Sequence, residues 1–209
     1  MEVVDNSSLG RIYQAAMQLF AEKGTQTISV SELAGRAGVA RGTIYNNMTS
    51  LDNLFEDVAS RLANQLAEAI VPLIETYDDP AERIAYGMKY ALKHAHDDPS
   101  WALFLIRFGI SNSSLRGFWE GSMAEDLGKG VEQERFKIAR DQIPTIIAMV
   151  TCSVLGGFHL VREGFQTWKN VAENVVELNL RALGVPLDTA KALAEKEYPF
   201  FFEYTKLPQ

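Results

Sequence analysis

Apolar residues recur along the chain at the spacing of amphipathic helices. The first stripe follows the i, i+3, i+4, i+7, i+8 pattern through Ile12, Ala15, Ala16, Leu19 and Phe20. This spacing predicts one helix with a single buried face, and Gly24 supplies its C-terminal stop. The chain has no internal repeat and no alternating Val/Ile/Thr-rich run between turn residues. We therefore expect no β-sheet.

Capping residues predict where the next helices begin. Ser29-Val-Ser-Glu32 has the form of a capping box and opens a short second helix. Gly38 ends that helix, and residues 41–47 form a third. Thr49-Ser-Leu-Asp52 is expected to cap a fourth, running from Leu51 towards Tyr77 with a kink at Pro72.

Asp-Pro pairs and serine caps divide the rest of the chain. Further helices are expected at about 80–96 and 99–109, from Ser113 or Ser114 onward, and at about 141–163, 168–183 and 187–197. The expected fold class is all-α. We divide the chain into an N-terminal three-helix unit, residues 1–50, and a larger helical domain, residues 51–209.

Charge is distributed unevenly between these two parts. The net charge of the whole chain is −7, which by itself argues against nucleic acid as a partner. Residues 8–50, however, have a balance of +2, whereas residues 51–209 have −7. A small positive unit on an acidic body fits a DNA-binding role for the first part, although +2 is a modest footprint.

The cysteine content and the N-terminus bear on location. The single cysteine, Cys152, excludes an internal disulfide, and no Cys/His cluster suggests a zinc module. Its apolar neighbours predict a packed thiol rather than a reactive one. The first residues are acidic and lack a long apolar stretch, so we expect no signal peptide and a cytoplasmic protein.

The two short helices, joined by a tight turn at Gly38 and backed by the first helix, have the arrangement of a helix-turn-helix. Many helical hairpins share that outline, but the residues are more specific. They are Ala15-Ala16-x-x-Leu19-Phe20-Ala-Glu-Lys-Gly24, Thr27-Ile-Ser-Val-Ser-Glu-Leu-Ala34, Ala37-Gly-Val, Gly42-Thr-Ile-Tyr45 and Leu54-Phe55. Over residues 11–55 the chain closely resembles the TetR (tetracycline-repressor) family. Beyond residue 60 the resemblance is architectural, apart from Arg181-Ala-Leu-Gly-Val185.

This resemblance implies a DNA interface centred on residues 41–47, the recognition helix that enters the major groove. Gly42 lets the backbone come close, and Thr43 offers a hydroxyl and a methyl group to thymine. The resemblance implies that Tyr45 contacts phosphate and that the two asparagines after it contact bases or backbone. The expected DNA-contacting residues are Ser29, Ser31, Arg41, Gly42, Thr43, Tyr45, Asn46 and Asn47. The alternative is that Tyr45 belongs to the core and the asparagines to a solvated loop.

Two positions depart from the family pattern. Met48 stands where the family usually has an aromatic residue, which is a tolerable packing change. Leu51 stands where a lysine often opens the fourth helix and faces phosphate. The missing charge puts DNA affinity or operator choice in question rather than the fold.

Residues 142–161 form a run of twenty uncharged residues. The length suits a membrane span, but the polar residues within it and the lack of flanking basic clusters favour a helix buried on both sides. The resemblance implies that this helix and the next pair with their mates in a four-helix dimer interface. The residues expected there are Ser153, Gly156, Gly157, Leu160, Val175 and Leu178. An entirely intramolecular core is the alternative.

The central helices carry many aromatic side chains, and the resemblance implies that some of them line an effector pocket. An apolar cavity with a few polar groups is typical of such a site. The residues expected to line it are Tyr86, Tyr90, His94, Phe104, Phe108, Trp119, Met123 and Phe158. Ordinary core packing is the alternative for each of them.

The sequence has no pair of residues at a spacing that suits a metal site or a catalytic nucleophile with its base. His94 and His96 point to different faces of one helix, and Cys152 and His159 are two turns apart. We expect no enzyme activity, no cofactor and no metal. The expected partners are double-stranded operator DNA, a small hydrophobic or aromatic effector and a second copy of the chain, with no membrane. The runner-up is a helical small-molecule-binding protein without a DNA role.

Overall fold

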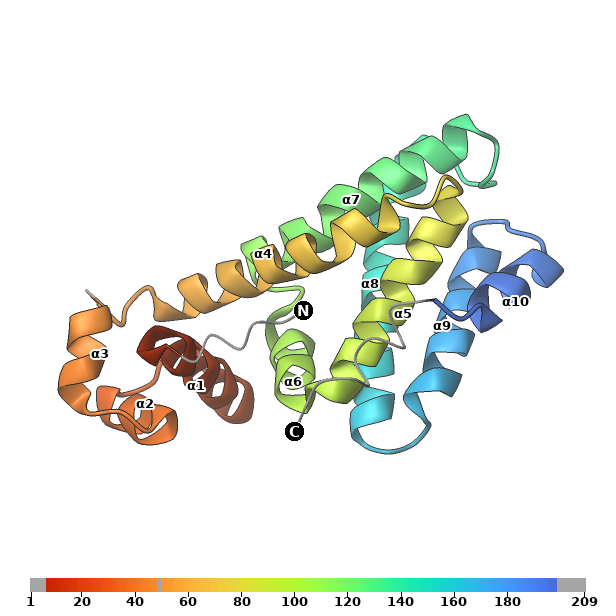
Figure 1. Ribbon diagram of the computed structural model, residues 1–209. Coiled ribbons are helices and arrows are strands. Elements are labelled where there is room, and N and C mark those ends of the chain that lie inside the picture. Colours follow the sequence, from red (N-terminus) through yellow and green to blue (C-terminus); the bar gives the residue numbers. More distant parts are fainter. Residues whose placement is uncertain (1–6, 49, 199–209) are drawn as a thin grey trace.

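The computed structural model describes residues 7–48 and 50–198, and within them it contains helices and no β-strand (Figure 1). The expected all-α fold class is confirmed. The elements are α1 Ser8–Lys23, α2 Val30–Ala37, α3 Arg41–Asn47, α4 Leu54–Ile74, α5 Pro80–Asp97, α6 Pro99–Phe108, α7 Ser113–Glu132, the short 3-10 helix η1 Arg140–Gln142, α8 Ile143–Arg162, α9 Trp168–Ala182 and α10 Leu187–Glu195.

Helices α1 to α3 form a compact group at one end of the molecule (Figure 1). The predicted stripe of α1 is buried, and Leu33 of α2 and Ile44 of α3 complete this small core. Gly24 and Gly38 end α1 and α2 in the left-handed region, with φ angles of 67° and 63°. Because glycine adopts positive φ without steric cost, these two residues set the sharp turns between the helices.

One predicted helix start and one predicted helix cap are wrong. Helix α4 begins at Leu54 rather than Leu51, because the Ser50 hydroxyl accepts from the Asp52 amide at 3.0 Å and closes a turn before the helix. Thr49, also expected in that cap, lies outside the described residues. Helix α7 is capped by Asn112 rather than by a serine, since its side-chain oxygen accepts from the amides of the second and third residues after it.

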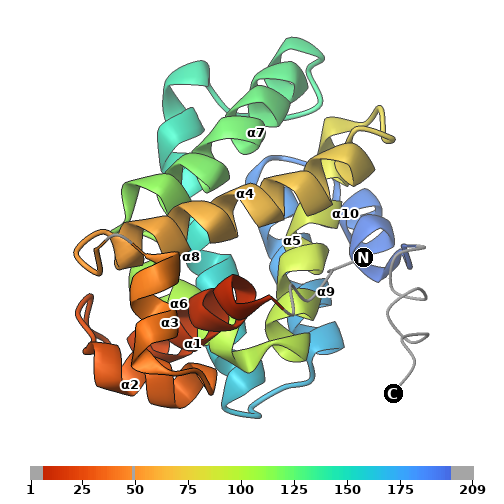
Figure 2. The ribbon, with the colours of Figure 1, turned by 60° about the vertical axis from the view of Figure 1, so that its left-hand side comes forward.

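The body is assembled around α5, which contacts α4 and every helix from α6 to α10. Helix α4 leaves the N-terminal group and runs along α7 (Figure 1), while α6 packs against α1 (Figure 2). The long α4 and the short α6 therefore form the two connections between the N-terminal group and the body.

Helix α8 is buried on one side only, so the prediction of burial on both sides is wrong for the single chain. Val150, Val154 and Phe158 face the core, whereas Met149 and Cys152 are exposed. The prediction of a packed thiol fails for the same reason, because one chain supplies only one layer of neighbours. The segment Arg140–Arg162 is long and apolar enough to cross a membrane by length and composition, with 39% of its most apolar window buried.

Candidate functional site

Helix α3 presents a continuous outward face at the end of the molecule. Ile44 is 1% exposed and anchors the helix, while the Tyr45 side chain is 67% exposed. Arg41, Asn46 and Asn47 are exposed as well. The alternative that placed Tyr45 in the core is therefore excluded, and α3 has the accessible surface that a helix needs to enter a DNA groove.

Ser29 is committed to the capping of α2. Its hydroxyl donates to Glu32 Oε2 at 2.8 Å and accepts from the Glu32 amide at 3.3 Å. Glu32 in turn receives a hydrogen bond from Lys23, and this bond together with those from Ser29 lowers the pKa of Glu32 to about 2. Ser31 is exposed, so it is the more available of the two predicted serines.

Asn47 also uses part of its side chain internally. Its Nδ2 donates to the carbonyl oxygen of Thr43 at 2.8 Å, one turn earlier in α3. This bond satisfies a carbonyl near the end of a short helix. Asn46 is exposed, and it is the asparagine whose amide is better placed to contact a base edge.

Ion pairs between helices occupy two of the four basic side chains in residues 8–50. Arg36 donates to both carboxylate oxygens of Glu22 at 2.7 and 2.6 Å, which lowers the pKa of Glu22. Lys23 is paired with Glu32. Arg41 is the basic residue of α3, and it forms no ion pair within the described residues. Its positive charge is therefore available to a phosphate group. Helical periodicity could not reveal these pairs, because their partners lie on different helices.

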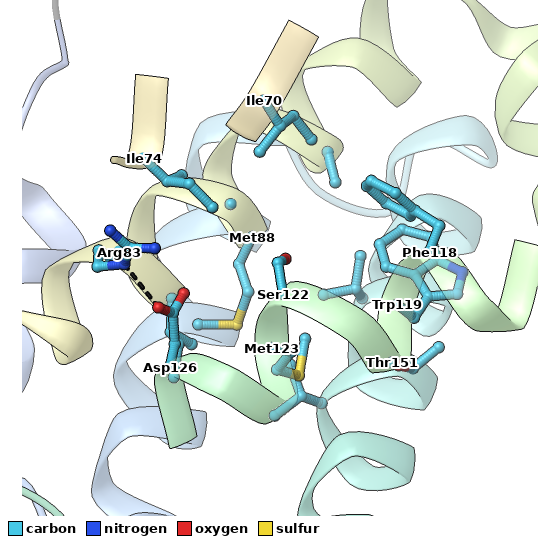
Figure 3. A pocket seen from close by; sticks show the side chains of 15 residues that line it. Ile70, Ile74, Arg83, Met88, Phe118, Trp119, Ser122, Met123, Asp126 and Thr151 are labelled. Carbon is cyan, nitrogen blue, oxygen red and sulfur yellow. Dashed lines mark hydrogen bonds and ion pairs between the residues drawn. The ribbon is translucent and has the colours of Figure 1, made fainter. Parts of the chain in front are cut away.

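A cavity lies between α4, α5, α7 and α8, with a free volume of about 50 Å³ (Figure 3). Its lining comprises Ile70, Ile74, Arg83, Ile84, Gly87, Met88, Ala91, Phe118, Trp119, Ser122, Met123, Asp126, Val150, Thr151 and Val154. Most of these side chains are apolar. The volume holds a few water molecules, so a larger guest requires the side chains to rearrange.

Polar groups lie on two sides of the cavity, and Ser122 lies between them (Figure 3). Arg83 Nε donates to Asp126 Oδ1 at 2.6 Å on one side, and Trp119 and Thr151 lie on the other (Figure 3). Burial raises the pKa of Asp126, although Arg83 opposes that effect. Trp119 Nε1 and Thr151 Oγ1 are buried and have no hydrogen-bond partner within the described residues.

Of the predicted effector residues, Trp119 and Met123 line this cavity and the other six do not. Tyr86 packs against Tyr77 and Tyr198, while Tyr90 and His94 stack on each other, with Trp101 against His94 and Phe158 against Trp101. Phe104 and Phe108 contact Phe55 near the N-terminal group. Five of these six side chains are buried in the core at other places, and His94 is half-buried beside them.

The face of α5 that lines the cavity was missed for a physical reason. This helix is surrounded by neighbours, so its apolar residues show which positions are buried but not which neighbour each one faces. Arg83, Gly87 and Met88 of α5 line the cavity. The predicted tyrosines lie on other sides of α5, towards α10 and towards the start of α6. Arg83 and Asp126 are 43 residues apart, and no local pattern links them.

The predicted dimer residues divide into an inner and an outer set. Gly157 is buried, and a Cβ there would lie 2.7 Å from Leu92 and 3.0 Å from Val171 of the same chain. Its assignment to a dimer interface is therefore wrong, because it mediates close packing within the chain. Ser153 accepts from Asn179 Nδ2 at 2.8 Å, again within one chain.

The outer set lies on the exposed sides of α8 and α9. Leu160 is 37% exposed and Leu178 is 60% exposed. A Cβ at Gly156 would meet no atom within 4 Å. Val175 is half-buried. Cys152 and Met149 extend this apolar surface, and neither was predicted to belong to it.

The described residues contain no group of three or more His, Cys, Asp or Glu side chains that could hold a metal ion. Besides the apolar surface of α8 and α9, the structure has two candidate sites. An exposed helix face lies at one end of the molecule, and a small, mostly apolar cavity lies inside the body.

Two family models match the chain. Residues 12–58 match bacterial regulatory proteins of the tetR family, and residues 79–196 match the tetracyclin repressor-like C-terminal domain. An HTH-type transcriptional regulator of Mycobacterium tuberculosis is 30% identical over 92 residues, which is 44% of this chain and 46% of that protein. The match thus spans about half the length of that relative. The repressor KstR2 of the same organism is 24% identical over 145 residues, 63% of this chain and 70% of that protein.

Solved structures share the fold along most of the chain. RolR in complex with resorcinol superposes with a TM-score of 0.68 at 23% identity, covering 92% of this chain and 95% of that one. FadR of Bacillus subtilis in complex with stearoyl-CoA gives a TM-score of 0.68 at 19% identity, covering 81% and 96%.

Proposed function

The chain belongs to the TetR family of transcriptional regulators, and from this premise we propose that it is a ligand-responsive repressor that binds operator DNA as a homodimer. Helix α3 is the DNA-recognition helix, and the cavity between α4, α5, α7 and α8 is the effector site. Residues 1–50 form the DNA-binding domain and residues 51–209 the effector-binding and dimerisation domain. The protein acts in the cytoplasm, without an enzymatic role.

The observation that carries the DNA-binding role is the exposed face of α3. Tyr45 is 67% exposed although it is a large aromatic residue, and Arg41 beside it has no ion pair within the described residues. An exposed tyrosine next to a free cation suits contact with phosphates, and Asn46 adds a group that can pair with adenine. Because phosphate contacts set the position and base contacts the sequence, these residues divide the two tasks.

The exposed apolar surface of α8 and α9 supports the dimer. Leu160 lies one turn after the open position at Gly156 on α8, and Leu178 is exposed on the neighbouring α9, so a helix from a second copy can approach closely. A two-fold dimer would place two α3 helices on one side, matching an inverted repeat in the DNA. The same pairing would cover the apolar part of α8 without any membrane.

The effector site is supported by the cavity and its lining. Apolar walls with a few buried polar groups are typical of small-molecule sites. The similar structures were solved with resorcinol and with stearoyl-CoA, ligands so different that neither identifies the effector of this chain. The effector proposed here is a small hydrophobic or aromatic compound that favours the DNA-free conformation.

Selection from a random DNA pool tests the DNA role. The purified protein should enrich an inverted repeat, since two copies related by a two-fold axis contact two equivalent half-sites. Tyr45→Ala and Arg41→Ala should enrich it poorly, whereas Arg140→Ala, at an exposed arginine of the body, should behave like wild type. Equal enrichment by all four proteins, or none by wild type, would refute a DNA-binding role for α3.

A further inference from the structure

Two buried polar atoms in the cavity wall have no hydrogen-bond partner within the described residues. They are Nε1 of Trp119 on α7 and Oγ1 of Thr151 on α8. Both residues line the cavity, and they are 9% and 7% exposed (Figure 3). Buried polar groups are nearly always paired with protein or with water, so these two atoms point to a polar guest.

The chemistry of the two atoms restricts that guest. An indole N–H can only donate a hydrogen bond, whereas a threonine hydroxyl can donate or accept. A group that pairs with either of them from inside the cavity can therefore be an acceptor, such as a carbonyl or hydroxyl oxygen. The walls around them are hydrocarbon and aromatic, including Ile70, Met88 and Phe118, so the rest of the guest must be apolar.

The charges in the cavity restrict the guest further. Arg83 and Asp126 neutralise each other across 2.6 Å, and their side chains are 13% and 3% exposed. A carboxylate guest would compete for Arg83 and leave Asp126 buried without its partner. An ammonium guest would compete for Asp126 in the same way. Breaking a buried ion pair by removing one partner is strongly unfavourable, so the cavity disfavours ionised guests.

The wall formed by α7 is suited to yield when a guest enters. This helix contains four glycines within residues 113–132, and glycine weakens a helix. At Gly117, Gly121 and Gly128 an added Cβ would meet nothing within 4 Å, so close packing does not explain them. Met88 and Met123 add flexible side chains that can change rotamer. The free volume of about 50 Å³ can thus expand without loss of the fold.

We propose that the effector is a compact, uncharged, apolar molecule with one hydrogen-bond acceptor, held by Trp119 and Thr151. This inference rests on the proposed function, because it takes the cavity as the effector site. It adds the chemical class that the cavity selects: neutral aromatic or alicyclic ketones, phenols and related oxygen compounds, as opposed to carboxylates, amines and plain hydrocarbons.

Three probes of nearly equal shape test the selection. Acetophenone presents a neutral acceptor, cumene replaces it with hydrocarbon, and benzoate replaces it with an anion. Dissociation constants are measured by ligand-detected NMR on the full chain. We expect acetophenone to bind about tenfold more tightly than either of the others, a ratio that corresponds to one buried hydrogen bond.

Variants locate the binding. Thr151→Val removes its polar atom with little change of shape, whereas Trp119→Phe removes the indole N–H together with one ring and enlarges the cavity. Both should bring the affinity for acetophenone towards that for cumene, and the ratio of the two affinities is compared in each variant because added space affects both probes alike. Gly87 lines the cavity, and a Cβ there meets nothing within 4 Å. Gly87→Leu should therefore fill the free space and block both probes, with Gly87→Ala as a milder version. Circular dichroism melting curves check that each variant is folded.

The outcomes separate this inference from the proposed function. If acetophenone and cumene bind equally, or benzoate binds best, and Gly87→Leu blocks them, the cavity is a ligand site but the selection proposed here is wrong. If no probe binds wild type, or binding ignores Gly87→Leu in a folded protein, both this inference and the effector site fail.

Discussion

Phe55 of α4 and Phe108 of α6 meet edge to face, with ring centroids 4.9 Å apart and an interplanar angle of 74°. Phe20 of α1 also meets Phe55 edge to face, with ring centroids 5.2 Å apart. These three rings join the N-terminal group to the body at the point where α4 and α6 converge. A movement of the body can therefore reach the N-terminal group through this contact, along α4, or through the rest of the packing between α6 and α1.

A double-mutant cycle measures the strength of this joint. Phe55→Leu and Phe108→Leu keep apolar bulk but remove the ring contact, so together they should destabilise the protein by less than the sum of the two. We expect a coupling free energy of about 0.5–1.5 kcal/mol, from urea unfolding. Phe55→Leu with Phe136→Leu, a ring of the core outside this contact, is the control cycle and should be additive. If the unfolding free energies of the first cycle are additive, the contact between Phe55 and Phe108 contributes no more than ordinary packing.

The face of α3 predicts two kinds of effect on DNA binding. Thr43→Ala should relax base preference, because we propose that its methyl and hydroxyl groups contact a base. Tyr45→Ala should weaken binding to all sequences, because a phosphate contact carries no sequence information. Each loss should be about 1–3 kcal/mol in anisotropy titrations against the selected operator. Wild-type behaviour of both variants would remove α3 from the interface.

Leu51 offers a gain-of-function test. It is half-buried and precedes α4, and the family resemblance leads us to expect a lysine that faces phosphate at this place. Leu51→Lys should tighten DNA binding in general and steepen the salt dependence by about one unit, since one more phosphate is neutralised. The affinity is measured across a salt series for both proteins. An unchanged slope would show that this position does not face the DNA backbone.

Substitutions at two adjacent glycines should distinguish effects on dimerisation from effects on folding stability. Gly156 is open, so Gly156→Leu should leave the chain folded but prevent close approach of a second α8. Gly157→Leu should instead destabilise the fold itself, because Leu92 and Val171 occupy the space, at a cost of about 1–3 kcal/mol or more. Light scattering should find a dimeric wild type and a monomeric Gly156→Leu with a retained melting transition.

Cys152 gives the same interface a chemical readout. It is exposed in the single chain and lies one turn before Gly156 on α8. A maleimide should therefore react slowly with the concentrated wild type and faster with Gly156→Leu, because the second copy shields the thiol. Rates that are equal and independent of protein concentration would place the dimer contact elsewhere.

Much of this fold is predictable because helix boundaries depend on residues that are close together in the sequence. The capping box at Ser29 and the glycine stops at Gly24 and Gly38 each depend on residues a few positions apart, and the structure confirms them. The contact face of α3 follows from the same local pattern, with Ile44 turned inward and Tyr45 outward.

The cavity and the dimer surface are different, because they depend on which helices become neighbours. Asp126 is an ordinary surface residue by sequence, yet it is buried against Arg83 of another helix. Gly156 and Gly157 look alike in the sequence, yet only one of them faces solvent. Periodicity assigns a residue to a buried or exposed side of its helix, but it does not say which element covers that side.

Lys89 predicts how stability depends on pH. It is 3% exposed, and its Nζ donates to the carbonyl oxygens of Ala194 and Lys196 at 2.7 and 2.6 Å. These bonds hold the end of α10 against α5. Burial, and to a smaller extent the nearby Lys169, lowers the pKa of Lys89 to about 8, although Glu173 opposes the shift.

The sign of the effect follows from proton linkage. Between about pH 8 and the ordinary lysine pKa of 10.5, the unfolded chain binds a proton at Lys89 that the folded chain has released, so this residue makes stability rise with pH. Below about pH 8 both states are protonated and its contribution is constant. Burial raises the pKa of Tyr198 above its ordinary value of 10.0, so above pH 10 the folded chain retains a proton that the unfolded chain loses, and stability falls again.

Urea unfolding at intervals from pH 7 to 10 should therefore show a rise above pH 8 in wild type. Lys89→Met should abolish that rise, whereas Lys191→Met, at an exposed position of α10, leaves Lys89 and its carbonyl partners in place and should retain it. A rise that survives in Lys89→Met would assign the pH dependence to another group and remove Lys89 as its cause.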